Sequence, residues 1–226
     1  MTTREELLQI YERLLERYGP QDWWPGDTRF EIMVGAVLTQ AAAWTNVEKA
    51  ISNLVDAGVL SPRAIRELDE SELARHIYPS GYFNAKARKL KALVEYLGNR
   101  FDDDLDAMSR EDAGALRAEL LGVYGIGEET ADDIMLYAVG MATFVADNYT
   151  RRMFSRLGIV PEKGSYSAYR AMFMDNLPSD RNLFQQYHAL IVQLGKDVCR
   201  KRPRCGDCCL LVVCPTGSEL SRSDDS

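Results

Sequence analysis

Four cysteines near the C-terminal end constrain the fold of this chain more than any other feature. They follow the pattern C-x5-C-x2-C-x5-C, at Cys199, Cys205, Cys208 and Cys214. In a reducing compartment such closely spaced thiols hold metal more often than they form disulfides. Structural zinc sites usually use two separated cysteine pairs, whereas one compact loop of four thiolates suits a 4Fe-4S cluster. The spacing therefore favours an iron-sulfur centre, and Cys209 is either an alternative ligand to Cys208 or a free, partly buried thiol.

The composition is that of a globular protein. The chain has 226 residues, 46% of them hydrophobic, which is enough for one or two compact domains. No stretch approaches the roughly 20 apolar residues of a membrane span. The charged start of the chain, from Met1 to Arg13, resembles a helix and not a signal peptide. We therefore expect a cytoplasmic protein that does not bind membranes.

The charge is acidic overall but unevenly distributed. A net charge of -7 and a pI near 5.0 argue at first against a nucleic acid partner. However, basic residues gather in three short segments, 86–91, 151–156 and 196–204. These segments could form a basic face that binds nucleic acid. Alternatively, they are ordinary solvated helix surfaces.

Apolar residues recur three and four positions apart along almost the whole chain, as in Leu183, Tyr187, Leu190, Ile191 and Leu194. No convincing alternating pattern predicts a strand. Glycine and proline breakers divide the chain into about ten short helices, so the sequence predicts an all-α protein. The polar tail after Pro215 is expected to fray into solvent.

A glycine-rich turn between two helical stretches is the second informative segment, at residues 120–134. Gly122, Gly125 and Gly127 are expected to give positive φ values and a close backbone approach to a ligand. The helix that follows offers unpaired N–H groups, so the segment is suited to grip a phosphate. The alternative is an ordinary helical hairpin with a glycine cap, in which Glu128 and Glu129 complement the helix dipole.

The chain resembles the helix-hairpin-helix DNA glycosylases of the endonuclease III superfamily over about residues 20 to 214. The resemblance is carried by the hairpin, by residues 144–153 (FVADNYTRRM) and by the cysteine loop. Four further motifs are similar to the 3-methyladenine DNA glycosylase III group, namely DWWP at 22–25, VLTQ at 37–40, PSGYFNAKA at 79–87 and GIGEETAD at 125–132. The first cysteine spacer has five residues where iron-sulfur members usually have six, and a cluster is not typical of the methyladenine group. The chain thus combines both patterns.

The resemblance implies a fold of two domains with a cleft between them. The six-helix barrel domain with the hairpin would span residues 22–138. Residues 1–21 and 139–226 would form a discontinuous cluster domain. The expected partner is double-stranded DNA that contains a damaged base, bound by a monomer with a 4Fe-4S cluster.

The resemblance also implies a reaction. In bifunctional members a lysine of the second hairpin helix attacks the sugar, and that position is Glu129 here. A carboxylate cannot form an imine, so we expect a monofunctional enzyme that uses water. Asp147 corresponds to the catalytic aspartate, which stabilises the sugar cation and orients the water. Taken without the family, Asp147 is predicted to be a helix N-cap, and both roles are compatible.

The remaining predicted site residues also come from the resemblance. The base pocket would consist of Trp23, Trp24, Pro25, Trp44 and Lys196, although each tryptophan also suits core packing and Lys196 also suits a phosphate or solvent. DNA would be contacted by Gln40, Tyr82, Gly122, Gly125, Ile126, Gly127 and Thr130. An electron-rich pocket favours an alkylated purine such as 3-methyladenine. The alternatives are a glycosylase for uracil, mismatched thymine or an oxidised pyrimidine, and a non-catalytic iron-sulfur DNA-binding module.

Overall fold

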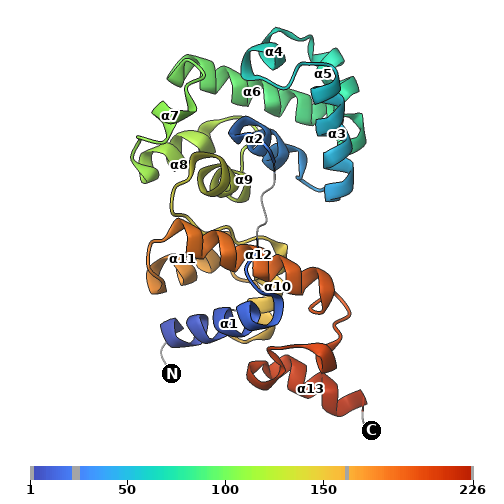
Figure 1. Ribbon diagram of the computed structural model, residues 1–226, viewed down its shortest axis with the longest axis vertical. Helices are drawn as coiled ribbons and strands as arrows, with labels where there is room; N and C mark the ends of the chain where they lie inside the picture. The colour runs from blue at the N-terminus through green and yellow to red at the C-terminus, as the bar shows by residue number, and fades with distance from the viewer. Residues whose placement is uncertain (1–2, 22–25, 161–162, 225–226) are drawn as a thin grey trace. The chain divides into compact units, whose positions relative to one another are not determined.

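The computed structural model describes residues 3–21, 26–160 and 163–224 (Figure 1). These residues form helices and turns, and they contain no β-strand, which confirms the predicted all-α class. The chain divides into two compact units. The hairpin unit is Trp24–Met141, and the cluster unit combines Met1–Trp23 with Ala142–Ser226.

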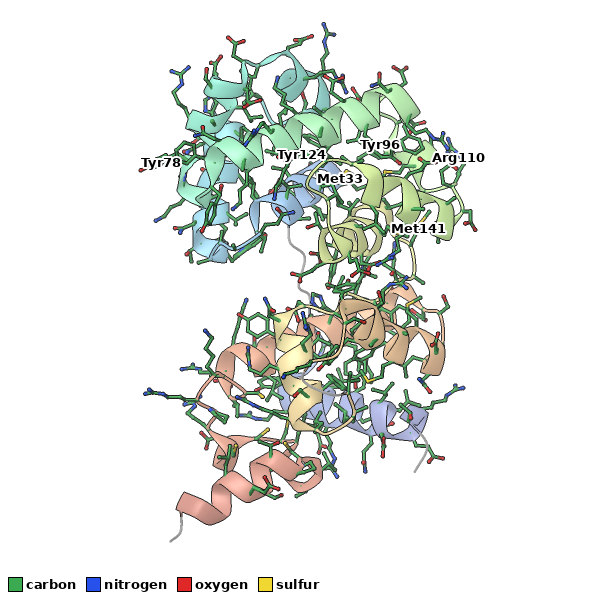
Figure 2. All side chains as sticks on the ribbon, turned by 180° about the vertical axis from the view of Figure 1, so that it is seen from behind. Met33, Tyr78, Tyr96, Arg110, Tyr124 and Met141 are labelled. Carbon is green, nitrogen blue, oxygen red and sulfur yellow. The ribbon has the colours of Figure 1, made fainter. Side chains whose placement is uncertain are left out.

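The hairpin unit contains α2 (Arg29–Leu38), α3 (Trp44–Asp56), α4 (Pro62–Glu67), α5 (Glu70–His76), η1 (Tyr78–Ser80), α6 (Phe83–Phe101), α7 (Leu105–Met108), α8 (Ala113–Gly122), α9 (Glu128–Asp133) and η2 (Ile134–Val139). The long α6 packs against α2, α4 and α5. Met33 of α2 is fully buried, whereas the rings of Tyr78 and Tyr124 are exposed (Figure 2). The buried face of α2 thus lies in the core, and the rings of Tyr78 and Tyr124 remain on the surface of this unit.

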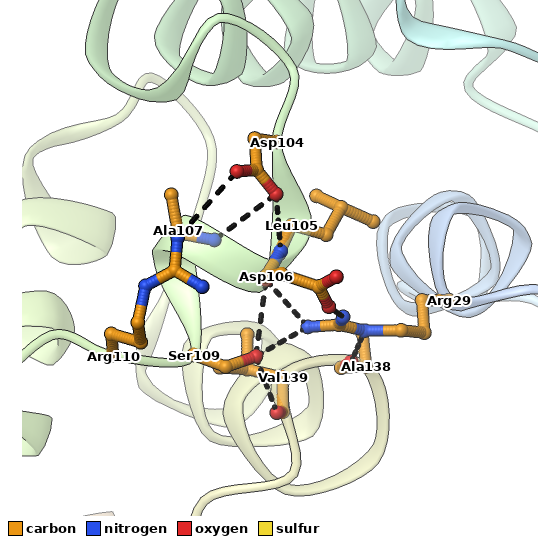
Figure 3. A network of polar contacts seen from close by, with 9 residues as sticks. All are labelled: Arg29, Asp104, Leu105, Asp106, Ala107, Ser109, Arg110, Ala138 and Val139. Atoms are coloured by element: carbon orange, nitrogen blue, oxygen red, sulfur yellow. Dashed lines mark hydrogen bonds and ion pairs between the residues drawn. The ribbon is translucent and has the colours of Figure 1, made fainter.

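Arg29, the first residue of α2, joins three elements of the hairpin unit (Figure 3). Its guanidinium donates to the carbonyl of Ala138 at 2.6 Å and to the carboxylate of Asp106 at 2.7 Å. It also donates to the Leu105 carbonyl and the Ser109 hydroxyl. Ala138 belongs to η2, a π-helical turn that directly follows α9. Arg29 therefore connects the start of α2 to the end of η2.

The cluster unit contains α1 (Thr3–Tyr18), α10 (Asn148–Arg156), α11 (Tyr166–Asn176), α12 (Arg181–Asp197), η3 (Cys205–Asp207), η4 (Leu211–Val213) and α13 (Pro215–Asp224). Aromatic rings fill its core, and the rings of Phe144 and Phe173 stack with centroids 3.5 Å apart. The buried hydroxyl of Tyr187 on α12 donates to the Leu7 carbonyl of α1 at 2.8 Å. That bond joins the start of the chain to its C-terminal half.

The prediction that the chain frays after Pro215 is wrong. Pro215 is the first residue of α13, which continues to Asp224. Proline is well tolerated at a first helical position, because its fixed φ suits the helix and its missing N–H would have had no intrahelical partner there. None of the described helices has the length and apolar character needed to cross a bilayer.

Candidate functional site

The hairpin turn joins α8 to α9 in the hairpin unit. Gly125 has a φ of +79°, the left-handed region that favours glycine. The prediction of positive φ is wrong for its two neighbours, because Gly122 is the last residue of α8 and Gly127 is extended with a φ of -92°. Gly127 is instead the N-cap of α9, and a methyl group built on it would meet nothing within 4 Å. Only Gly125 is required by backbone conformation, while Gly127 leaves open space in front of the helix.

Gln40 is tied to this turn. Its side-chain amide donates to the Gly125 carbonyl at 3.1 Å and to the Thr130 hydroxyl at 2.9 Å. Its oxygen accepts a hydrogen bond from the ammonium of Lys89. The stem of Lys89 also packs against Gly125, where an added methyl group would lie 2.3 Å from it. The structure therefore brings together three of the predicted DNA-contacting residues, Gln40, Gly125 and Thr130, and adds Lys89.

A second contact that the sequence did not indicate fixes the two hairpin helices to each other. Arg117 of α8 donates two hydrogen bonds, of 3.0 and 2.9 Å, to the carboxylate of the buried Asp132 on α9. Paired bonds of this kind are strong and directional.

Glu129 is exposed in the first turn of α9, as expected for an acid that complements a helix dipole. Ile126 of the turn is buried.

Two aromatic residues of the hairpin unit lie in different surroundings. Tyr82 is the N-cap residue of α6, has a φ of 48° and is 75% exposed. Trp44, the first residue of α3, is half-buried, and a methyl group on Gly35 of α2 would lie 3.8 Å from its ring. Tyr82 is thus free to project into a ligand, whereas Trp44 packs on α2. Trp23, Trp24 and Pro25 lie outside the described residues.

Asp147 of the cluster unit is the N-cap of α10, which confirms the predicted capping role. Its carboxylate accepts a hydrogen bond from the Thr150 amide at 2.8 Å. The Nε2 atom of the buried His188 lies 3.6 Å from the other carboxylate oxygen, an ion-pair distance longer than a hydrogen bond. Burial raises the pKa of Asp147, but His188 and the Thr150 amide outweigh it and hold that pKa below its usual value. The carboxylate, 14% exposed, is therefore ionised at neutral pH.

The cysteine loop follows α12 and contains the short turns η3 and η4. A cavity there is lined by Arg156, Thr216, several apolar residues and four of the five cysteines, Cys199, Cys205, Cys208 and Cys214. Cys209 is not among the lining residues. Among the described residues, no three cysteine, histidine or acidic side chains lie close enough to hold a single metal ion. Four thiols around one cavity fit the ligand set of a 4Fe-4S cluster, in which each thiolate binds its own iron atom.

Two arginines of α10 connect this loop to the helix that Asp147 caps. Arg152 donates to the carbonyls of Cys199 at 2.7 Å and Gly195 at 3.0 Å. Arg156 donates to the Cys199 sulfur at 3.3 Å and to the Arg200 carbonyl at 2.7 Å. The sequence showed these arginines only as part of a basic segment, and their partners more than 40 residues away could not be predicted from it.

Lys196, in the last turn of α12, is exposed. Its carbonyl accepts a hydrogen bond from Arg200 at 2.8 Å, which joins the end of α12 to the cysteine loop. Gly195 beside it lies against the Tyr149 ring of α10, where an added methyl group would come within 2.4 Å of that ring. The glycine thus allows α10 and α12 to approach closely.

Comparisons with known proteins agree with this arrangement. Residues 34–179 match the family model of the HhH-GPD superfamily of base excision DNA repair proteins. A Methanocaldococcus jannaschii protein named as a DNA repair glycosylase is 44% identical over 211 residues, covering 93% of this chain and 96% of the relative. Endonuclease III of Sulfolobus acidocaldarius is 29% identical over 216 residues, covering 91% of this chain and 94% of that protein.

Solved structures show the same fold. An endonuclease III bound non-covalently to DNA aligns with a TM-score of 0.83 over 98% of this chain and all of its own, at 21% identity. The 3-methyladenine DNA glycosylase of H. pylori, bound to 1,N6-ethenoadenine, is 28% identical and aligns with a TM-score of 0.74 over 87% of this chain and 98% of its own. The chain therefore belongs to the HhH-GPD superfamily of base excision DNA repair proteins, as a DNA glycosylase of the endonuclease III type.

Proposed function

We propose that the protein is a monofunctional glycosylase that hydrolyses the N-glycosidic bond of an alkylated purine in duplex DNA. The observation that carries the proposal is Glu129, an exposed carboxylate at the hairpin position where bifunctional relatives have a lysine. An imine needs an amine, so water completes the reaction and leaves an intact strand with an abasic site.

Asp147 supplies the charge that this reaction needs. As the base departs, positive charge develops on the sugar, and a fixed carboxylate stabilises it. The low pKa of Asp147 supports this role, because the group is already ionised and is held in place by the Thr150 amide. The same carboxylate can orient the attacking water, as acidic groups do in glycoside hydrolysis.

The alkylated-purine substrate is supported by residue type and by a relative. Trp23, Trp24, Pro25 and Trp44, with Lys196, match the pocket positions of the methyladenine group, and the H. pylori relative carries a modified adenine. Aromatic faces attract an electron-poor or cationic ring, which an N3-alkylated purine presents. Such a base is also a good leaving group.

DNA is gripped through its backbone by the hairpin. The open space at Gly127 and the first N–H groups of α9 suit a phosphate. Gln40 would fill the gap left by the extruded base, and the exposed Tyr82 would wedge the opposite strand. A monomer that displaces roughly three to six counterions should bind duplex DNA more weakly as salt rises.

The four cavity-lining cysteines would hold a 4Fe-4S cluster, whose contribution when bound is to order the loop beyond α12. Burial raises the pKa of the Cys208 thiol to about 11, so metal binding must displace its proton. Purified protein should be brown and contain iron. Colourless protein with stoichiometric zinc would contradict this assignment.

The function is tested by mass spectrometry of the free bases released from alkylated, deaminated and oxidised duplexes. We expect alkylated purines alone, with strand breaks only after alkali and no covalent adduct trapped by borohydride. Release of uracil, thymine or an oxidised pyrimidine would identify that base as the substrate in place of an alkylated purine. A trapped adduct would show that an amine of the protein is the nucleophile. If no duplex loses a base but all are bound, the protein is a non-catalytic DNA-binding module.

A further inference from the structure

One buried lysine of the hairpin unit has no part in the function proposed above. Lys86 lies in the first turns of α6 and is only 1% exposed. Its ammonium donates to the Leu38 carbonyl at 2.8 Å and to the Ser80 carbonyl at 2.7 Å. A buried amine of this kind costs folding free energy unless its donors are satisfied, and an apolar side chain would fill the space more cheaply.

The two carbonyls occupy corresponding places in the chain. Leu38 is the last residue of α2, and Gln40 follows it by two positions. Ser80 is the last residue of η1, and Tyr82 follows it by two positions. Lys86 thus holds the ends of the two elements that directly precede Gln40 and Tyr82, the proposed gap-filling and wedging residues.

The backbone at both places is strained. Ala41 has a φ of 52° and Tyr82 a φ of 48°, the left-handed region that non-glycine residues rarely adopt. Such residues are conformationally unfavourable and persist where the surrounding structure fixes them. Strain beside both side chains, with one ammonium between their anchoring carbonyls, indicates that their positions are fixed before DNA is bound.

We propose that Lys86 is a positioning residue that sets Gln40 and Tyr82 at the separation needed to enter the DNA stack together. This inference rests on the proposed function of the hairpin unit. The ammonium meets the negative end of the α2 dipole and satisfies a last-turn carbonyl of that helix. Removing the ammonium would release both turns. Gln40 and Tyr82 would then no longer be held at the separation needed to act on the same base pair.

The same helix provides a matched control. Lys91 lies five residues after Lys86 on α6, and its ammonium donates to the carbonyls of Arg66, at 2.9 Å, and Leu68. It therefore holds the C-terminal end of α4 by the same chemistry, without contacting the segments that carry Gln40 and Tyr82. Lys86→Met and Lys91→Met remove similar bonds, and only the first should affect DNA distortion.

The test uses the full-length protein and a duplex with a tetrahydrofuran abasic analogue opposite 2-aminopurine, whose fluorescence rises when it is unstacked. Wild type and Lys91→Met should raise the fluorescence at saturating protein. Lys86→Met should bind the duplex and lose this rise. A protein that is merely less stable would still give the full rise at saturation, so the amplitude separates positioning from folding.

If Lys86→Met does not fold, Lys86→Gln keeps a shorter donor in the same place and should fold and lose the rise. A full rise with either folded variant would overturn the role of Lys86 alone. A wild-type protein that neither binds the abasic duplex nor releases a base would overturn the proposed function, and the role of Lys86 with it.

Discussion

The hairpin turn at 122–127 and the cysteine loop at 199–214 are both short irregular segments that follow a helix, but different atoms hold them in shape. The hairpin is fixed by protein contacts on several sides, including the Arg117–Asp132 pair and the bonds of Gln40. The cysteine loop has local backbone bonds within its turns, is contacted by arginines of α10 and by α13, and has a cavity among its sulfurs. Protein contacts from several elements therefore preorganise the hairpin, whereas the sulfurs of the loop line a cavity that the proposed cluster would fill.

Asp147 should give the largest effect, because it is the proposed catalytic carboxylate. Asp147→Asn keeps a side chain that can cap α10 but removes the negative charge. Loss of one preorganised electrostatic group costs about 10²–10³ in rate, so single-turnover excision should fall by that factor while binding to lesion DNA survives.

Asp180 offers the control for this change. It caps α12 by accepting hydrogen bonds from the Asn182 and Leu183 amides, and it is not among the candidate site residues. Asp180→Asn should leave excision unchanged. If Asp147→Asn is also fully active, Asp147 is only a cap and the catalytic carboxylate lies elsewhere.

The second largest effect is expected in the cysteine loop, where loss of one cavity-lining thiolate should affect the whole loop. Cys199→Ser removes a cavity-lining thiolate and should abolish the visible absorbance, the iron content and the protection of the loop from proteolysis. Cys209→Ser should keep all three, because Cys209 does not line the cavity. The hairpin should keep its affinity for undamaged DNA in both variants. Loss of iron on changing Cys209 would reassign the ligands.

Two glycines of the hairpin separate folding from binding. Gly125→Ala places a methyl group at φ +79° and against the Lys89 stem, so the free energy of unfolding should fall by about 1–2 kcal/mol. Gly127→Ala has room for its methyl group at a negative φ and should lose less stability than Gly125→Ala, although alanine is a poorer N-cap than glycine. It should weaken duplex binding, because that space faces the proposed phosphate. Urea unfolding and salt-dependent binding assays measure the two effects. Equal loss of stability in both variants would contradict the distinction.

The features that the sequence predicted correctly depend on neighbours within a few residues. Apolar spacing predicted the helices, and the preference of aspartate for N-caps predicted the bond from Thr150 to Asp147. The error at α13 has a local cause as well, since a polar composition does not prevent a helix that begins with proline.

The features that could not be predicted depend on contacts between distant segments. Gln40 and Thr130 are 90 positions apart, and the carbonyl of Leu38 is 48 positions from Lys86. No periodic pattern encodes such pairs. Lys86 in particular occupies a segment that looks like an exposed basic patch, although its side chain is buried. The predicted roles of Asp147 and Gln40 in catalysis and DNA binding came from the family resemblance, because their residue types alone suit a cap and a polar surface.

The stability of the protein at alkaline pH tests whether the preorganisation of the hairpin unit includes a buried charge. Burial, together with the nearby charge of Lys89, lowers the pKa of Lys86 from 10.5 to about 8. Between these two values the unfolded chain holds a proton that the folded protein has released, so the stability of wild type should rise with pH relative to Lys86→Met. Below pH 8 both states are protonated and the difference should be constant. Urea unfolding of the two proteins from pH 7 to 10.5 measures this difference, and the other titrating groups cancel. A difference that stays flat across the range would mean that the two carbonyls compensate fully for burial, so that Lys86 keeps an ordinary pKa inside the core.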